Sequence, residues 1–207
     1  MTKTGKLFII SGPSGAGKGA ISRRVAAGGG AYLSVSMTTR APRAGETEGV
    51  SYFFVSHDEF RAKIAERGFF EFAEVYGEYY GTPKAPVESH IAKGEDVVLE
   101  IDIKGAMQAV EAAPDAVTIF VLPPSLAELR KRIEGRATDS KEAIERRLAK
   151  AVGEIGFLPK YDYCIVNDRL GDAVDRVKRV MAGEIPKVTT EEAAALVRKF
   201  EEEKEKE

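Results

Sequence analysis

Short apolar runs rich in β-branched and aromatic residues recur along the chain. They show little alternation of polar and apolar positions, which is typical of strands buried on both faces of a parallel sheet. Helix-compatible stretches lie between them. Alternating strands and helices form βαβ units, so the pattern predicts an α/β fold with a doubly wound parallel sheet. The runs are residues 7–11, 97–102, 118–122 and 163–167, and the helical stretches are residues 18–27, 104–113, 125–134 and 141–154.

Two segments interrupt this alternation. The first is rich in Gly, Pro, Tyr and Phe, contains an alternating fragment at 52–55, and is interpreted as a partly antiparallel subdomain inserted into the core. The second carries many arginines and is interpreted as a helical lid. The result is a single domain, with core segments at about 5–35, 90–124 and 158–186, an insertion at about 36–89 and a lid at about 125–157.

The C-terminal tail, residues 187–207, differs from both the core and the two insertions. Residues 191–200 are predicted to form one helix that is capped by Thr189 or Thr190 and carries glutamates in its first turn. The last residues, EEEKEKE, are predicted to be solvated and to fray.

Composition fits one globular domain, because 43% of the 207 residues are hydrophobic and 31% are charged. The net charge of −2 gives no global attraction for nucleic acid or an anionic membrane, so an anionic substrate must meet local arginines. The single cysteine, Cys164, lies in an apolar run and is interpreted as a small buried hydrophobic residue, which fits a reducing compartment. No apolar stretch is long enough for a signal peptide or a spanning helix, so we expect a cytoplasmic protein.

A phosphate-binding loop is predicted directly after the first apolar run. The string GPSGAGKG lies between a strand and a helix, with the glycine and lysine spacing of a Walker A loop. Glycines let backbone N–H groups turn toward phosphate oxygens, and the following helix directs its positive end at the same anion. Gly19 departs from the pattern, which ends in Ser or Thr. The predicted ATP-binding residues here are Gly12, Pro13, Ser14, Gly15, Ala16, Gly17, Lys18, Gly19 and Ala20.

A second anion site is predicted in the insertion. Arg40 and Arg43 lie three residues apart around a proline, and an arginine fork matches phosphate oxygens two at a time. Tyrosines and carboxylates follow, as a purine monophosphate would require for its phosphate and its base edge.

Taken together, these strings resemble the guanylate kinase family. The strings GPSGAGKG, SVSMTTRAPRAGETEG, SYFFVS, FFEFAEVYGEYYGT, VVLEIDIKGA, LRKRIEGRATDS and CIVND occur in the order that the family has, over about residues 5 to 183. Several motifs in the correct order are far more specific than one. The resemblance implies a cytoplasmic enzyme of purine nucleotide metabolism that phosphorylates GMP, and dGMP, with ATP and magnesium, and that has no nucleic-acid, membrane or obligate protein partner.

The resemblance also implies roles for individual residues of the acceptor site. The phosphate of GMP would be held by Arg40, Arg43, Tyr52 and Tyr80. Guanine N1–H and the 2-amino group would donate to Glu71 and Asp102, and guanine O6 or N7 would contact Ser36 and Thr82. Glu100 is also assigned to this site, at a position where the family has an acidic residue near the metal and nucleotide.

On the donor side, the resemblance implies that Lys18, Arg136 and Arg147 are catalytic and that Asn167 lies in the adenine pocket; Arg132 fits the lid set less well. GMP phosphate is already a nucleophile at neutral pH, so we expect no general base. We assign no direct protein ligand to Mg²⁺, which ATP oxygens and waters would hold, and leave Ser14 and Ser22 open as hydroxyl ligands.

Other interpretations stay open. Asp102 could instead cap the following helix, Glu71 could be surface charge, and Tyr79 is assigned to core packing. His57 and His90 are assigned no role. The chain could also be a guanylate-kinase-like module that binds proteins, or a P-loop kinase with another acceptor. The intact loop lysine argues against the first alternative, and Glu71 with Asp102 argues against the second.

Overall fold

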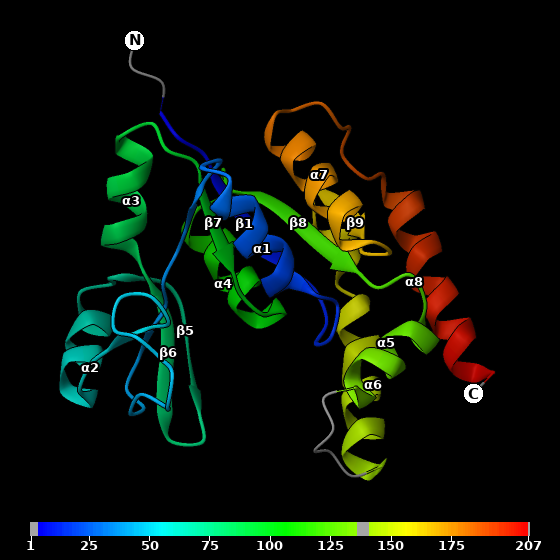
Figure 1. Cartoon of the computed structure of the whole chain (residues 1–207), viewed down its shortest axis with the longest axis horizontal. Coiled ribbons are helices and arrows are strands. Elements are labelled where there is room, and N and C mark those ends of the chain that lie inside the picture. The colour runs from blue at the N-terminus through cyan, green and yellow to red at the C-terminus, as the bar shows by residue number, and fades with distance from the viewer. Residues whose placement is uncertain (1–3, 136–140, 207) are drawn as a thin grey trace.

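A five-stranded parallel sheet forms the centre of the computed structural model, which describes residues 4–135 and 141–206 (Figure 1). Its strand order is β2-β7-β1-β8-β9, so the first long strand lies in the middle. All neighbouring strands are parallel, and β1 pairs with β7 on one side and with β8 on the other. The predicted doubly wound sheet is confirmed, with one short strand, β2, that the sequence pattern did not indicate. The strands are β1 (Leu7–Ser11), β2 (Tyr32–Leu33), β7 (Val97–Glu100), β8 (Val117–Leu122) and β9 (Tyr163–Val166).

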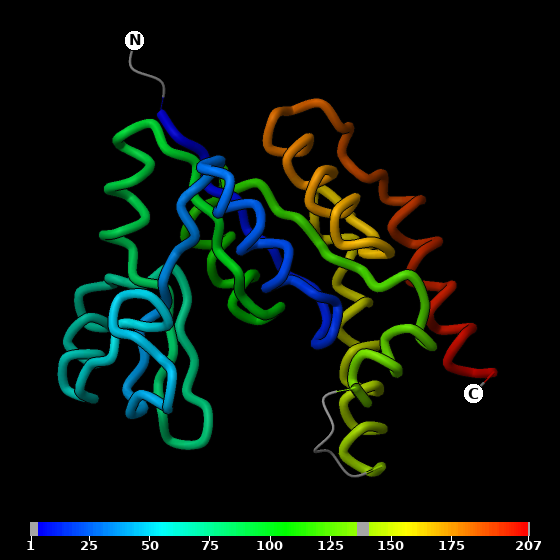
Figure 2. Tube along the Cα trace, viewed as in Figure 1, coloured from blue at the N-terminus to red at the C-terminus, as the bar shows by residue number. Residues whose placement is uncertain are grey.

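A second, four-stranded sheet lies within the predicted insertion. Figure 2 shows the chain leaving the core after β2, forming this separate lobe, and returning through α3 (Lys84–Ala92). The sheet is mixed, since β3 and β4 are parallel while the other pairs are antiparallel. Tyr79 stacks on the buried ring of Phe60 with centroids 5.3 Å apart, as its assignment to packing predicted. The order is β4-β3-β6-β5, from β3 (Met37–Thr38), β4 (Phe53–Phe54), β5 (Phe69–Val75) and β6 (Glu78–Pro83), with α2 (His57–Ala65) alongside.

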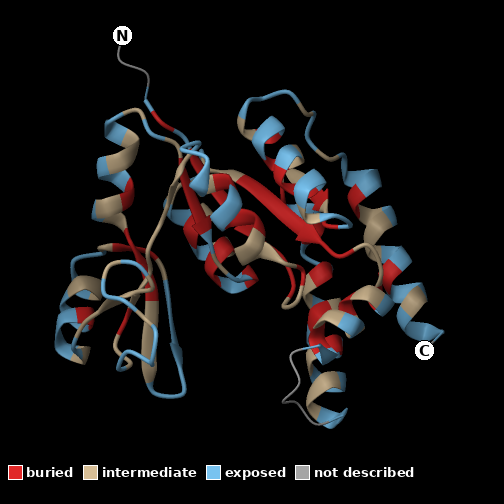
Figure 3. Ribbon diagram, in the orientation of Figure 1, coloured by how far each residue is buried: buried red, intermediate tan, exposed pale blue. Residues whose placement is uncertain are grey.

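Alternate residues of the central strands pack into two apolar layers. In β1, Leu7 and Ile9 face one layer, while Phe8 and Ile10 face the other, and all four are buried. The first layer includes α4 (Ile103–Ala112), and the second includes α1 (Lys18–Ala27) and α7 (Leu170–Met181). Figure 3 shows β8 buried along nearly all of its length, after its first residue. Burial on both faces explains why the strands have continuous apolar sequences.

The predicted lid consists of α5 (Leu126–Glu134) and α6 (Lys141–Ile155), followed by the short helix η1 (Leu158–Lys160). These helices and the second sheet lie on opposite sides of the central sheet in Figure 1. Leu129, Ile133 and Leu148 are buried in the first core layer, so the base of the lid is packed onto the core.

The C-terminal helix α8 (Thr190–Glu205) packs against the base of the lid. Thr189 and Glu192 form a reciprocal capping box, which confirms one of the two predicted caps. Phe200 is buried in the first core layer, and the helix continues to Glu205. Residues 201–205 are thus helical and mostly exposed, as the prediction of a solvated end requires, while the fraying stays a prediction. Glu203 accepts a hydrogen bond through Oε2 from the backbone N–H of Leu126, at 2.7 Å, and so caps the start of α5.

Replacement of Glu203 by alanine is expected to lower the free energy of unfolding by about 1 kcal/mol, because one N-terminal N–H of α5 loses its acceptor. Urea titration of the purified protein measures the change. Glu202→Ala is the matched control, since Glu202 is exposed on the same helix. Equal unfolding midpoints for the two variants would contradict a capping role.

Three further observations concern the part of the chain that the structure describes. None of the helices in the described part of the chain is both long and apolar enough to cross a membrane. Cys164 is half-buried, and burial raises the pKa of its thiol to about 12, as expected for a packing residue rather than a reactive one. Residues 4–135 and 141–206 contain no group of three His, Cys, Asp or Glu side chains that could hold a metal ion.

Candidate functional site

The loop between β1 and α1 has the backbone of an anion-binding site. Gly12, Gly15 and Gly17 all have positive φ, at 141°, 88° and 95°, which favours glycine. A Cβ on Gly12 would also lie 2.2 Å from the carbonyl oxygen of Val121, so the loop can pass the neighbouring strand only with glycine there. Gly17 is the N-cap of α1 and supplies no side-chain cap, which leaves the first N–H groups of the helix available to an anion.

Lys18 lies across this loop. Its Nζ donates to the carbonyl oxygens of Gly12 and Pro13, at 2.6 and 3.1 Å. These contacts hold the ammonium group beside the N-terminus of α1, where both contribute positive charge. The loop can therefore bind a polyphosphate, with Lys18 as the side-chain cation.

The lid reaches the same loop through α6. Arg147 donates from Nη2 to the hydroxyl of Ser14 at 3.2 Å, and Glu154 accepts from the Ser14 backbone N–H at 3.3 Å. One predicted lid arginine is thus brought to the phosphate loop. The other, Arg136, lies outside the described residues.

Asn167 braces the loop. It is buried, and its Nδ2 donates to the carbonyl oxygen of Ala16 at 2.8 Å. The same atom lies 2.3 Å from where a Cβ on Gly17 would be, so a side chain at that position would displace the amide. Arg132 donates to the backbone oxygen of Asn167 at 2.9 Å. The contact with adenine that was assigned to Asn167 stays a prediction. In the structure, the side-chain amide donates to the loop carbonyl of Ala16 instead.

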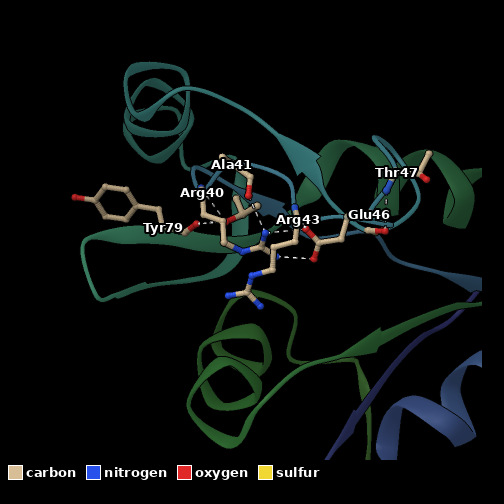
Figure 4. Close-up of polar contacts among 8 residues, drawn as sticks. Arg40, Ala41, Arg43, Glu46, Thr47 and Tyr79 are labelled. Carbon is tan, nitrogen blue, oxygen red and sulfur yellow. Dashed lines mark hydrogen bonds and ion pairs between the residues drawn. The ribbon is translucent and has the colours of Figure 1, made fainter.

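Arg40 is held by a carboxylate that the sequence analysis did not single out. Figure 4 shows the guanidinium of Arg40 facing Glu46, with both nitrogen–oxygen distances at 2.7 Å. Glu46 also accepts from the backbone N–H of Arg43 at 2.7 Å, while the Arg43 side chain turns away from it (Figure 4). Bonding to Arg40 and Arg43 lowers the pKa of Glu46 to about 2, and bonding to Glu46 raises the pKa of Arg40. In the sequence, the only indication of this ion pair is that Glu46 follows Arg43 by three residues.

Aromatic side chains surround the Arg40 guanidinium. It lies over the ring of Tyr52 at 5.2 Å, and the Tyr52 and Tyr80 rings meet edge to face at 6.1 Å. Three of the four residues assigned to the acceptor phosphate are therefore adjacent. Ser36, Tyr52 and Glu100 also line one cavity of about 440 Å³.

The side chain of Glu71, from β5, reaches the start of α4, where Asp102 is the N-cap. The hydroxyl of Thr82 donates to Oε1 of Glu71 at 2.6 Å. Asp102 is the N-cap of α4 and accepts from the backbone N–H of Gly105 at 2.8 Å, so the alternative interpretation as a cap is confirmed. Burial, with a smaller contribution from the Asp102 charge, raises the pKa of Glu71. A half-buried carboxylate of this kind is stabilised by hydrogen-bond donors, as Thr82 already provides and as a bound ligand could add.

Comparison with known proteins gives a consistent picture. The family described as Guanylate kinase matches residues 4–184. A guanylate kinase of Clostridium acetobutylicum is 50% identical over 184 residues, which cover 89% of this chain and 88% of that protein. One of Thermus thermophilus is 47% identical over 180 residues, or 87% and 82% of the two chains. The crystal structure of guanylate kinase from Anaplasma phagocytophilum superposes with a TM-score of 0.69 at 34% identity, covering 89% of this chain and 88% of that one.

Proposed function

The chain belongs to the guanylate kinase family, and we propose that it transfers the γ-phosphoryl group of ATP to GMP, forming ADP and GDP. One observation carries the choice of acceptor base. The Glu71 carboxylate is held between Thr82 and Gly105 at the start of α4, so its two oxygens can accept from the adjacent N1–H and 2-amino donors of guanine.

The mechanism depends on placement and positive charge rather than on covalent chemistry. The loop N–H groups and Lys18 would hold the ATP phosphates, while Arg40, Arg43, Tyr52 and Tyr80 would hold the phosphate of GMP. Arg147 would stabilise charge that develops on the transferred group, from its place beside Ser14. Arg136 is proposed for the same role. Closure of the lid and the second sheet would exclude water, which could otherwise accept the phosphoryl group. No residue is proposed as a general base.

Magnesium is the proposed metal, and it would neutralise charge on the β- and γ-phosphates. Gly19 lacks the hydroxyl that Ser or Thr supplies at the end of a Walker A loop, but a carboxylate lies close to the position of that missing side chain. The carboxylate oxygens of Glu100 lie 3.2 and 3.3 Å from the point that a Cβ on Gly19 would occupy, and Nη1 of Arg23 lies 3.2 Å from the same point. Oxygen ligands suit Mg²⁺, so the residues present fit the ion when ATP supplies the remaining ligands.

Magnesium is expected to bind weakly without nucleotide and tightly with it, because one carboxylate cannot replace the waters that Mg²⁺ holds. Titration calorimetry of the protein alone should give negligible heat with Mg²⁺, and a clear binding isotherm when a non-hydrolysable ATP analogue is present. Strong binding to the protein alone would mean that several protein carboxylates form the site.

An acceptor panel at fixed ATP and Mg²⁺ tests the proposed function. ADP release is measured with GMP, dGMP, AMP, CMP and UMP, and without an acceptor. We expect turnover with GMP and dGMP. Turnover with another acceptor alone would favour a different P-loop kinase, and none at all would favour a protein-binding module. We also propose that the enzyme acts in the cytoplasm, where both substrates are available, without an obligate protein partner.

A further inference from the structure

Gly105 lies where the local backbone gives no reason for a glycine. It is the third residue of α4 and is buried. Its φ is not among the positive values of the described glycines, so alanine could adopt the same backbone conformation. Glycine is also among the poorest helix formers, and alanine is the best. The reason for Gly105 must therefore lie in what packs against it.

The space beside Gly105 is filled by the carboxyl group of Glu71. A Cβ on Gly105 would lie 2.9 Å from Glu71 Oε2, 3.2 Å from its Cδ and 3.3 Å from its Cγ. The first distance is shorter than real side-chain contacts allow, so an alanine would force the carboxyl group to move. By contrast, Gly171 in α7 has no atom within 4 Å of the same point. The Glu71 carboxyl group is thus the group that a side chain at Gly105 would displace, whereas a side chain at Gly171 would displace nothing.

The other side of the Glu71 carboxylate is fixed by the second sheet. Oε1 accepts from Thr82, which pairs with Glu71 across β5 and β6. The register between these strands shifts between Phe69 and Glu71, and such a bulge redirects the side chains that follow it. Phe69 and Phe70 are consequently both buried. The backbone N–H of Phe72 also donates to Oε1 of Gln108 on α4, at 3.2 Å, which ties β5 to the helix.

We propose that Gly105 is a positioning residue for base selection, an inference that rests on the proposed function. Because Gly105 has no side chain, the Glu71 carboxylate can lie between Thr82 and the first turn of α4. Both of its oxygens then stay in the place that the two adjacent donors of guanine require. Displacing the carboxylate would misalign this pair of hydrogen bonds and weaken the distinction between guanine and hypoxanthine, which lacks the 2-amino group.

Steady-state kinetics with GMP and with IMP test this role in the parent enzyme, Gly105→Ala and the control Gly171→Ala. We expect Gly105→Ala to lower kcat/KM for GMP by about tenfold or more, chiefly through KM, and to reduce the preference for GMP over IMP. The KM for ATP should stay unchanged, and Gly171→Ala should resemble the parent. An unaltered GMP-to-IMP ratio in Gly105→Ala would overturn the inference.

A double-mutant cycle separates displacement of Glu71 from a general packing defect. In a Glu71→Ala background there is no carboxylate to displace, so adding Gly105→Ala should leave the kinetics unchanged and raise the melting temperature. The same double variant should fold even if Gly105→Ala alone does not. If Gly105→Ala lowers kcat/KM for GMP by the same factor in the parent and in Glu71→Ala, or if the double variant does not fold, the role of Glu71 is refuted. If the parent enzyme does not phosphorylate GMP, the proposed function itself fails, and this inference fails with it.

Discussion

Glu71→Gln is expected to abolish most of the preference of this enzyme for GMP. The parent should favour GMP over AMP by about 10⁴–10⁵ in kcat/KM, as sites built to hydrogen-bond a substrate do. Adenine presents an acceptor at N1, which would face the lone pairs of the carboxylate, and the half-buried position between Thr82 and Gly105 gives the carboxylate little room to turn toward water. Glutamine keeps the shape but replaces one acceptor with a donor. The loss should therefore fall on GMP, with little change in the KM for ATP.

The measurement is kcat/KM for GMP and AMP at saturating ATP. Glu74→Gln provides the matched control, because Glu74 lies on the same strand and is exposed. Parent-like turnover of GMP by Glu71→Gln would mean that guanine is recognised elsewhere.

Lys18→Ala is expected to lower kcat by about 10²–10³ while leaving the fold intact. The Nζ donates to the loop carbonyls of Gly12 and Pro13, and these carbonyls can be solvated after substitution. No core packing is lost, so the free energy of unfolding should change little. What disappears is the cation that would stabilise the transferring phosphoryl group.

Single-turnover and steady-state kinetics, together with urea unfolding, separate the two effects for Lys18→Ala. Arg24→Ala is the control, since Arg24 is an exposed cation on the same helix. Near-normal turnover in Lys18→Ala would refute the assignment of the phosphate loop, whereas a large loss of stability would mean that the lysine is structural.

Much of the fold followed from local patterns in the sequence. Strand β1 and helix α1 have the predicted bounds, and the boundaries of β7, β8 and β9 differ from prediction by one or two residues. Continuous apolar runs and glycine spacing are local properties, because burial on both faces and positive φ constrain each residue directly. The short strand β2 was missed because two residues carry no periodicity.

The partners of individual side chains were decided by tertiary structure. Asn167 bonds to Ala16 across 151 positions of sequence, and Glu203 caps α5 across 77. The bulge in β5 and the packing of that strand on α4 bring Glu71 to Gly105, and neither leaves a local signal. The sequence by itself determined the family, the glycine-rich loop after β1 and the order of the longer core strands and helices. Only the tertiary structure determined which side chains hold the functional groups in place, because contacts between distant segments depend on how whole elements pack.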